Sequence, residues 1–240
     1  MFPAQKKGQE KFFEQSMIQE IAAKEKLKKI DCEYIGLPKV VSKGDQIALY
    51  EFYRGGTLAS KIKKGLSEQD LQKYAIQLME CLSTLHDDAK IVHLDIKPDN
   101  ILLHNGKIKV IDFEMWQKKG VNCGPIGTGE YCSPEILAAW NASQIQAKPS
   151  HDLWAAGISL YEMVYKKTPV SRETCVAVQN ASEKGGIALQ NAQSAYQIEF
   201  DAALKPLKAK KNPTPIDKAI LQLLSGEPTA KDALKILKGG

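Results

Sequence analysis

The sequence is poor in cysteine, and its cysteines are not arranged as a disulfide framework. Five occur in the 240 residues: Cys32, Cys81, Cys123, Cys132 and Cys175. The number is odd and no pair has C-x-x-C spacing, which disfavours both a structural zinc site and a disulfide-stapled domain. We therefore expect a protein of a reducing compartment, namely the cytoplasm.

Long apolar runs are also absent. No window approaches the roughly 18 apolar residues of a membrane-spanning helix. The first residues, MFPAQKKGQEKFFEQ, contain no apolar stretch of the secretory-signal type. The sequence therefore predicts no transmembrane segment and no secretory leader.

The sequence has no large excess of charge of one sign. There are 33 basic and 28 acidic residues, for a net charge of +5. So mild a balance predicts no nucleic-acid partner. Lysines gather in two short stretches, 24–29 and 204–211. Solvated helix faces explain these stretches better than a phosphate- or lipid-binding patch does.

The hydrophobic content of 43% is enough for one sizeable core, and its pattern predicts strands and helices. Apolar residues recur at helical spacing over 9–30, and two strand-like runs follow around the turn signal Gly44-Asp45. Ser67 is a predicted N-cap of the next helix. From Asp152 onward the pattern is helical. The expected fold class is α+β.

The motif HLDIKPDN, residues 93–100, carries the chemistry. Pro98 excludes a continuous helix, so Asp95 and Asn100 can converge. The runs NILLH and KIKVIDF are joined by the hairpin signal Asn-Gly and deliver Asp112 to the same place. Carboxylate and amide oxygens suit Mg²⁺ with a phosphate-bearing ligand. Lys97 places a positive charge beside a transferring phosphoryl group.

Four further segments accompany this motif in a fixed order. They are LYEFYRGGTL (49–58), IDFE (111–114), GTGEYCSPE (127–135) and HDLWAAGISLYEM (151–163). Together with residues 93–100, they make the chain resemble the eukaryotic-type protein kinase family, over roughly residues 9 to 240. The resemblance implies a two-lobe fold in one kinase-like domain. Residues 1–50 would form a reduced small lobe with an αC-like helix and two or three strands, and residues 51–240 a mainly helical large lobe.

The resemblance also implies roles for individual residues. Asp95 would orient or accept the proton of the substrate hydroxyl, and Lys97 would neutralise the γ-phosphate. Thr128 would brace both of them. Asn100 and Asp112 would hold the metal, Mg²⁺ or Mn²⁺, that accompanies ATP.

Further roles concern the nucleotide and the frame of the site. The backbone of Glu51 and Tyr53 would pair with adenine, with Tyr50 as gatekeeper, and Asp152 would hold the catalytic loop from beneath. Lys97 and the GTGEY segment are typical of serine/threonine kinases. Lys97 and the S-P-E segment (133–135) favour a protein substrate over a small molecule.

The sequence departs from the family in its first segment. No glycine-rich G-x-G-x-x-G loop is present. Lys6, with Lys7 as the alternative, would be the nucleotide lysine, and Glu20 its ion-pair partner. Lys24 stands one turn later where an apolar residue is usual, so Glu14 competes for the role of Glu20.

The second departure concerns the metal-binding loop and the activation segment. Glu114 replaces the D-F-G glycine, where its charge would either repel phosphate or recruit a further cation. Leu94 replaces the arginine that commonly pairs with a phosphorylated activation segment. Residues 114–126 contain no Ser, Thr or Tyr, so we predict no phosphorylation switch there. No arginine partner for Glu135 is evident.

Two functions of different classes follow. One is an atypical, minimal serine/threonine kinase in which an activating partner or ligand replaces the glycine-rich loop that covers the ATP phosphates. A kinase of this type delivered by a pathogen would act in host cytoplasm. The other is a pseudokinase that binds or scaffolds. A kinase-fold enzyme with a non-protein substrate is a third alternative. The sequence favours no particular oligomeric state.

Overall fold

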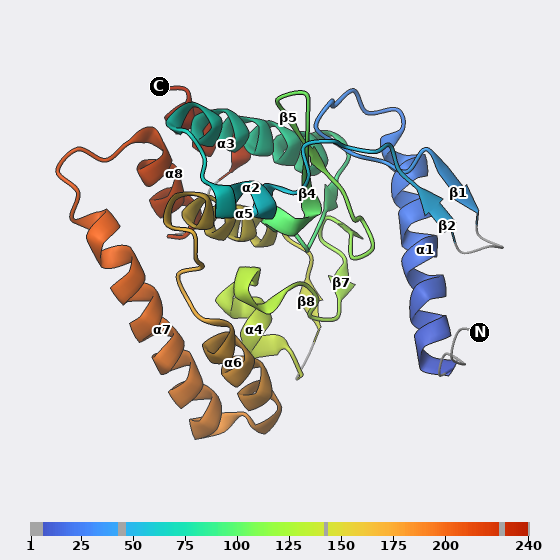
Figure 1. Cartoon of the computed structure of the whole chain (residues 1–240). Helices are drawn as coiled ribbons and strands as arrows, with labels where there is room; N and C mark the ends of the chain where they lie inside the picture. Colours follow the sequence, from blue (N-terminus) through green and yellow to red (C-terminus); the bar gives the residue numbers. More distant parts are fainter. Residues whose placement is uncertain (1–6, 43–46, 142–143, 226–228, 240) are drawn as a thin grey trace.

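The computed structural model describes residues 7–42, 47–141, 144–225 and 229–239, with only the backbone path given for 7–14, 40–42 and 47–48. Helix α1 (Lys7–Leu27) and the hairpin of β1 (Val40–Ser42) and β2 (Ile47–Leu49) form a small part on one side (Figure 1). A larger, mainly helical part makes up the rest. The predicted fold class, α+β with a reduced small β lobe and a helical large lobe, is confirmed.

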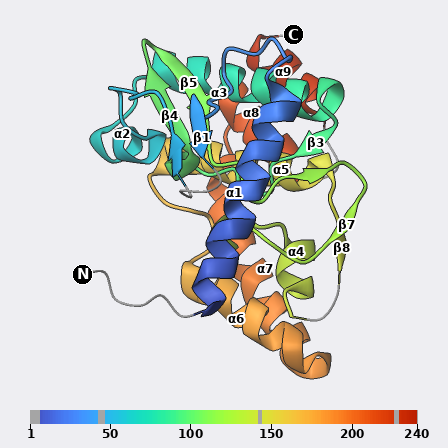
Figure 2. The same cartoon turned by 90° about the vertical axis from the view of Figure 1, so that its right-hand side faces the viewer.

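The small part is joined to the large part through the inner face of α1. Ala23 and Leu27, one turn apart on this helix, are buried in the main core. The hairpin pairs Val40 with Leu49 in an antiparallel register. Figure 2 shows α1 crossing the face of the molecule in front of the large part. The Gly44-Asp45 turn lies outside the described residues.

The large part is built on α-helices packed around one of their number, α5, which is apolar nearly all round and mostly buried. The helices of this part are α2 (Leu58–Lys64), α3 (Glu68–Ser83), α4 (Pro134–Ala139), α5 (Pro149–Tyr165), α6 (Arg172–Lys184), α7 (Gly186–Lys208), α8 (Pro215–Leu223) and α9 (Ala230–Leu237). Helix α3 runs on into a π-helical turn, η1 (Thr84–Asp88). Two 3₁₀ turns, η2 (Pro98–Asn100) and η3 (Gly129–Tyr131), complete it.

Side-chain caps explain where several of these helices begin. Ser67 accepts the backbone N–H of Asp70, which confirms its predicted N-cap role at α3. Thr214 and Thr229 open α8 and α9 with full capping boxes. Each such cap typically stabilises a helix by about 1 kcal/mol.

Short antiparallel pairs lie around the predicted catalytic loop, residues 93–100. Strands β4 (Ile101–His104) and β5 (Lys107–Val110) form the predicted hairpin, with Asn105 and Gly106 both at positive φ, as a tight two-residue turn requires. Strand β3 (Ile91–Val92) pairs with β6 (Gln117–Lys118), and β7 (Asn122–Cys123) pairs with β8 (Ile145–Gln146). These pairs fix the segments before and after the catalytic loop.

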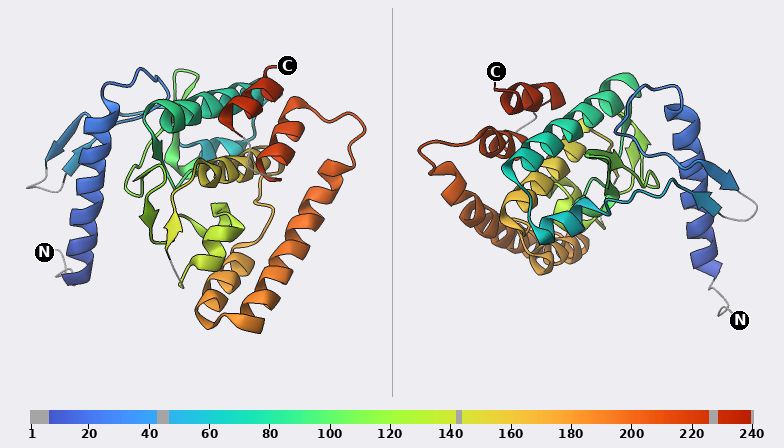
Figure 3. Two further views of the ribbon diagram at one scale, coloured as in Figure 1. Left: turned by 180° about the vertical axis from the view of Figure 1, so that it is seen from behind. Right: turned by 45° about the horizontal axis from the view of Figure 1, so that its top comes forward.

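The helices α6 and α7 form a long antiparallel pair at the end of the molecule farthest from α1 (Figure 3). Pro206 lies within the last turn of α7. Among the described residues, no helix has both the length and the apolar character needed to cross a membrane.

Candidate active site

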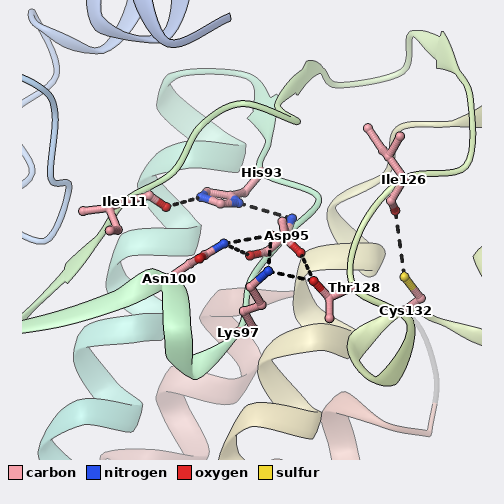
Figure 4. A network of polar contacts seen from close by, with 8 residues as sticks. All are labelled: His93, Asp95, Lys97, Asn100, Ile111, Ile126, Thr128 and Cys132. Atoms are coloured by element: carbon pink, nitrogen blue, oxygen red, sulfur yellow. Dashed lines mark hydrogen bonds and ion pairs between the residues drawn. The ribbon is translucent and has the colours of Figure 1, made fainter. Parts of the chain in front are cut away.

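Three side chains form a closed ring of polar contacts in the catalytic loop (Figure 4). Lys97 Nζ donates to Asp95 Oδ2 and to Thr128 Oγ1, both at 2.7 Å. Thr128 Oγ1 donates to Asp95 Oδ1 at 2.7 Å. Ile96, between the two loop residues, is fully buried. The extended backbone therefore turns Asp95 and Lys97 to the same side, away from the core.

Asn100 is brought back to Asp95 by the 3₁₀ turn η2. Pro98 occupies the first position of this turn, where its missing N–H costs nothing. Asn100 Nδ2 donates to the carbonyl oxygen of Asp95 at 3.0 Å and to its Oδ2 at 2.8 Å. The Asn100 amide nitrogen is thus committed, and its oxygen is left as the atom that can accept or ligate.

His93 links the catalytic loop to the segment that carries Asp112. Its Nδ1 accepts the N–H of Asp95 at 3.2 Å, so its Nε2 is the donor to the carbonyl oxygen of Ile111, 3.1 Å away. The ring also packs on Phe113, with centroids 4.7 Å apart. One neutral imidazole therefore holds two separate loops in register.

Asp152 supports the loop from beneath. This fully buried residue of α5 accepts the backbone N–H groups of His93 and Leu94, both at 2.8 Å, and contacts His86 Nε2 at 2.8 Å. Burial would raise the pKa of Asp152, but the hydrogen bond and charge of His86 and the groups of His93 lower it overall. A buried carboxylate with this many donors fixes the loop backbone.

Asp112 has a strained backbone conformation, and it follows Ile111, to which His93 donates. Its φ is 68° and that of Leu94 is 67°, values that non-glycine residues rarely adopt and that cluster at functional sites. Among the described residues, no group of three or more His, Cys, Asp or Glu could hold a metal alone. The carboxylate of Asp112 and the free oxygen of Asn100 nevertheless fit Mg²⁺, which takes one or two protein ligands plus phosphate oxygens.

Helix α1 reaches this site through Glu20. The buried Glu20 carboxylate accepts the N–H of Phe113 at 2.7 Å and the hydroxyl of Tyr50 at 2.8 Å. Trp116 Nε1 donates to the carbonyl oxygen of Gln19 at 3.0 Å. Burial raises the pKa of Glu20, and its two hydrogen bonds offset this only in part. The α1 helix is therefore tied to the loop that carries Asp112.

The lysine expected opposite Glu20 lies outside the described residues, because Lys6 belongs to the first six. Among the side chains that the structure describes, none forms an ion pair with Glu20. The side chains of Lys7 and Glu14 are likewise not described. The contacts of Glu20 with Tyr50 and Phe113 are those that a residue facing the site would make.

The comparison with known families agrees with this geometry. The family model for the protein kinase domain matches residues 3–233. The chain belongs to the protein kinase family. Its similarity therefore extends over both the small and the large part of the fold.

Individual relatives are serine/threonine kinases of moderate identity. Mouse "Serine/threonine-protein kinase MRCK alpha" is 36% identical over 135 residues, covering 52% of this chain and 8% of the relative. Human MRCK beta is 34% identical over 158 residues, 61% of this chain and 9% of the relative. The chk1 kinase of Schizosaccharomyces pombe is 36% identical over 128 residues, which cover 50% of this chain and 24% of the relative. The chain thus matches only a small share of each relative's length.

The segment after β2, where the hinge is predicted, leads from the small part into the large part. Tyr53 is buried edge-on against His104, with ring centroids 5.4 Å apart, and the Glu51 carboxylate lies 3.4 Å from Lys39 Nζ. Gly55 then donates its N–H to Leu103 in β4. A Cβ at Gly55 would lie 2.4 Å from the Leu103 oxygen, so only glycine allows the hinge to dock here.

Glu114 stands where the family has the D-F-G glycine. It is half-buried, and burial together with the neighbouring charge of Asp112 raises its pKa, partly opposed by a hydrogen bond with Ser16. The Glu114 side chain therefore connects the loop that carries Asp112 with α1. It brings a further carboxyl group close to Asp112.

The activation segment is held by apolar contacts around Leu94. This buried residue forms a small cluster with Val92 and Ala147, against which Met115, Cys123 and Ile126 pack. Gly127 passes so close that a Cβ there would lie 2.8 Å from the Leu94 oxygen, at a φ of 122°. Apolar packing thus fills the place where the family commonly has an arginine paired with a phosphate.

Glu135 has partners that the sequence analysis did not identify. Its carboxylate lies 2.8 Å from Lys148 Nζ and 3.3 Å from His151 Nε2, at the start of α5. Burial would raise the pKa of Glu135, but these two partners lower it overall. The sequence contained a signal for these partners, since both basic residues stand just before the D-L-W motif. The sequence analysis expected an arginine near the C-terminus instead.

Proposed function

We propose that this protein transfers the γ-phosphoryl group of ATP to a serine or threonine hydroxyl of a protein substrate. The observation that carries the proposal is the ring formed by Asp95, Lys97 and Thr128, with Asn100 turned back onto it. The carboxylate of the proposed base, Asp95, thus has a cation and a proposed metal ligand within hydrogen-bond reach. Phosphoryl transfer requires this combination.

Each residue of the ring has a separate task in this proposal. Asp95 orients the substrate hydroxyl and accepts its proton, while Thr128 and Asn100 fix the rotation of its carboxylate. Lys97 stabilises negative charge on the transferring group. Asn100 and Asp112 hold Mg²⁺ or Mn²⁺, which neutralises charge on the ATP phosphates when bound.

The nucleotide occupies the space between hinge and catalytic loop in the same proposal. The N–H of Tyr53 and the carbonyl oxygen of Glu51 have no backbone hydrogen-bond partner among the described residues, so both can pair with adenine. Lys6 pairs with Glu20 at the phosphates. Residues 1–50 serve as the small lobe and 51–240 as the large lobe of a cytoplasmic enzyme, and a partner or ligand supplies the roof over the phosphates.

A nucleotide-binding pseudokinase is the second candidate, and Glu114 favours it. Its carboxyl group stands beside Asp112, close to where the ATP phosphates would lie. A negative charge there weakens phosphate binding unless a cation or proton neutralises it. The two candidates differ in turnover, not in fold.

The experiment is label transfer from radiolabelled ATP to protein acceptors, with Mg²⁺ and with Mn²⁺. Wild type is compared with Asp112→Ala and with Asp99→Ala, an exposed neighbour in η2 that serves as the matched control. We expect wild type and Asp99→Ala to label serine and threonine, and Asp112→Ala to lose at least about 100-fold. Equal labelling by Asp112→Ala would refute the proposal.

A thermal shift with ATP and Mg²⁺ separates the two candidates. Stabilisation by nucleotide without label transfer identifies the pseudokinase, and transfer identifies the enzyme.

A further inference from the structure

The five cysteines differ sharply in their surroundings. Cys81, Cys132 and Cys175 are buried, whereas Cys32 and Cys123 are partly exposed. Burial raises the pKa of the Cys123 thiol, and it raises that of Cys175 to about 12. The pKa of Cys32 is instead lowered to about 6, chiefly by a hydrogen bond from Cys81. Only Cys32 is both accessible and readily ionised, and a thiolate is the reactive form of cysteine.

The loop that carries Cys32 packs against the core cluster that contains Cys81 of α3. The N–H of Ile35 closes a turn here by donating to the carbonyl oxygen of Cys32 at 3.3 Å. The thiol of Cys81 also points to this loop, with Sγ 3.8 Å from the carbonyl oxygen of Tyr34. Two thiols from distant parts of the sequence thus meet at a single turn.

We propose that Cys32 and Cys81 form a reversible disulfide when the protein meets a hydroperoxide. In the first step the Cys32 thiolate attacks a peroxide oxygen. An S–O bond forms, the O–O bond breaks, and the sulfur gives two electrons to the peroxide. The other peroxide oxygen leaves as alkoxide or hydroxide, which takes a proton from water. In the second step the Cys81 sulfur attacks Cys32. The S–S bond forms, the S–O bond breaks, and hydroxide leaves with the thiol proton of Cys81 as water.

The order of these steps follows from exposure. Cys81 is fully buried, so an oxidant in solution reaches Cys32 first and Cys81 acts only as the resolving thiol. Reversible disulfides of this kind occur in reducing compartments, where permanent ones are rare.

The bond would join the two parts of the molecule. Cys32 lies between α1 and Gly36, whose N–H donates to Val110 at the end of β5. Cys81 belongs to α3 in the large part. Oxidation would therefore fix the segment that follows α1 to helix α3.

The test is peroxide treatment of the whole chain, then alkylation, trypsin digestion and mass spectrometry. The expected product joins peptides 30–39 and 74–90, with the loss of two hydrogens and reversal by dithiothreitol. Cys32→Ser should abolish it. Cys123→Ser, which removes the other partly exposed thiol, should leave it unchanged.

A dimedone probe for sulfenic acid makes the test independent of kinase activity. In wild type the label on Cys32 should be transient, because Cys81 resolves it. In Cys81→Ala the label should persist, at least about tenfold above wild type. A persistent label on wild-type Cys32 with no joined peptide would overturn the proposal, as would a joined peptide containing another cysteine. If Cys81→Ala fails to fold, the Cys32→Ser result decides alone.

Discussion

The Asp95 carboxylate has specific donors on both of its oxygens. Lys97 and Asn100 share one oxygen and Thr128 takes the other. Hydrogen bonds to a charged group contribute about 1.5–3 kcal/mol each. Loss of one donor should therefore misorient the base without unfolding the protein.

Thr128 provides the cleanest test of this orientation. For Thr128→Ala we expect kcat to fall about 10- to 100-fold, the equivalent of one such bond, with little change in KM for ATP. Thr128→Ser keeps the hydroxyl and should retain most of the activity. Steady-state phosphorylation kinetics measure both quantities. A kcat for Thr128→Ala equal to that of wild type would show that the contact is not functional.

Glu20 should make stability depend on pH. Because its folded pKa is raised, its contribution to stability is complete below about pH 4.5, the unfolded value, and is lost as pH rises through the folded pKa. Gln at this position can keep both hydrogen bonds without the charge. We therefore expect Glu20→Gln to match wild type near pH 4 and to have the higher Tm at pH 8.

Two other variants control this measurement. Glu20→Ala should lower the free energy of unfolding by about 1–3 kcal/mol, because the buried N–H of Phe113 loses its acceptor. Glu173→Gln, at an exposed position of α6 with no ion pair among the described residues, is the control for the loss of one carboxylate. These measurements use the protein without nucleotide. A Tm for Glu20→Gln below that of wild type at pH 8 would mean that a cation, such as Lys6 in the proposed pair, stabilises the carboxylate even there.

Sequence reasoning at this scale worked where spacing alone brings residues together. Asp95, Lys97 and Asn100 lie within six positions around a proline, so local geometry nearly determines their contacts. The partners of Glu135 were missed because Lys148 and His151, at the start of α5, meet it only in the folded chain.

The activation segment, as an element, is anchored by packing around Leu94. The sequence predicted that no phosphorylation switch operates here, and nothing in the structure tests that prediction directly. We expect the activity of wild type to be unchanged by phosphatase treatment, measured as transfer rate before and after. A large loss of activity after treatment would contradict the apolar anchor.

Leu94→Arg should be harmful for the same reason. The guanidinium would enter the buried apolar cluster of Val92 and Ala147. Burying an unpaired charge there costs several kcal/mol. We expect a lower Tm and a reduced transfer rate. Leu94→Met preserves volume and should cost less than about 1.5 kcal/mol. Thermal denaturation of the two variants compares them. Tolerance of arginine would show that the cluster is open.

Helix starts were predictable where a cap or a proline marks them, as at Ser67. The separation of α6 from α7 was not predicted, because the sequence analysis described the pattern from Asp152 onward only as helical. Their boundary lies at Gly185 and Gly186, both at positive φ. Which sides of α6 and α7 are buried depends on how the two helices pack in the folded chain.

The whole molecule brings three distant segments together: the catalytic loop, the segment after the β4–β5 hairpin, and α1. Kinase motifs predicted this convergence because their order along the chain reflects the fold. The contacts of Glu20 depend on how α1 packs, and Lys24 had left Glu14 as a competitor. The hydrogen bond from Phe113 favours Glu20.

The most direct test is phosphoryl transfer by Asp95→Asn, with nucleotide binding measured on the same protein. Asparagine keeps the shape: its oxygen can accept from Lys97 and Asn100 while its nitrogen donates to Thr128. Only the base is lost. We predict a thermal shift with ATP and Mg²⁺ equal to that of wild type, and a transfer rate at least about 100-fold lower. Transfer at the wild-type rate would contradict the assignment of Asp95 as the base.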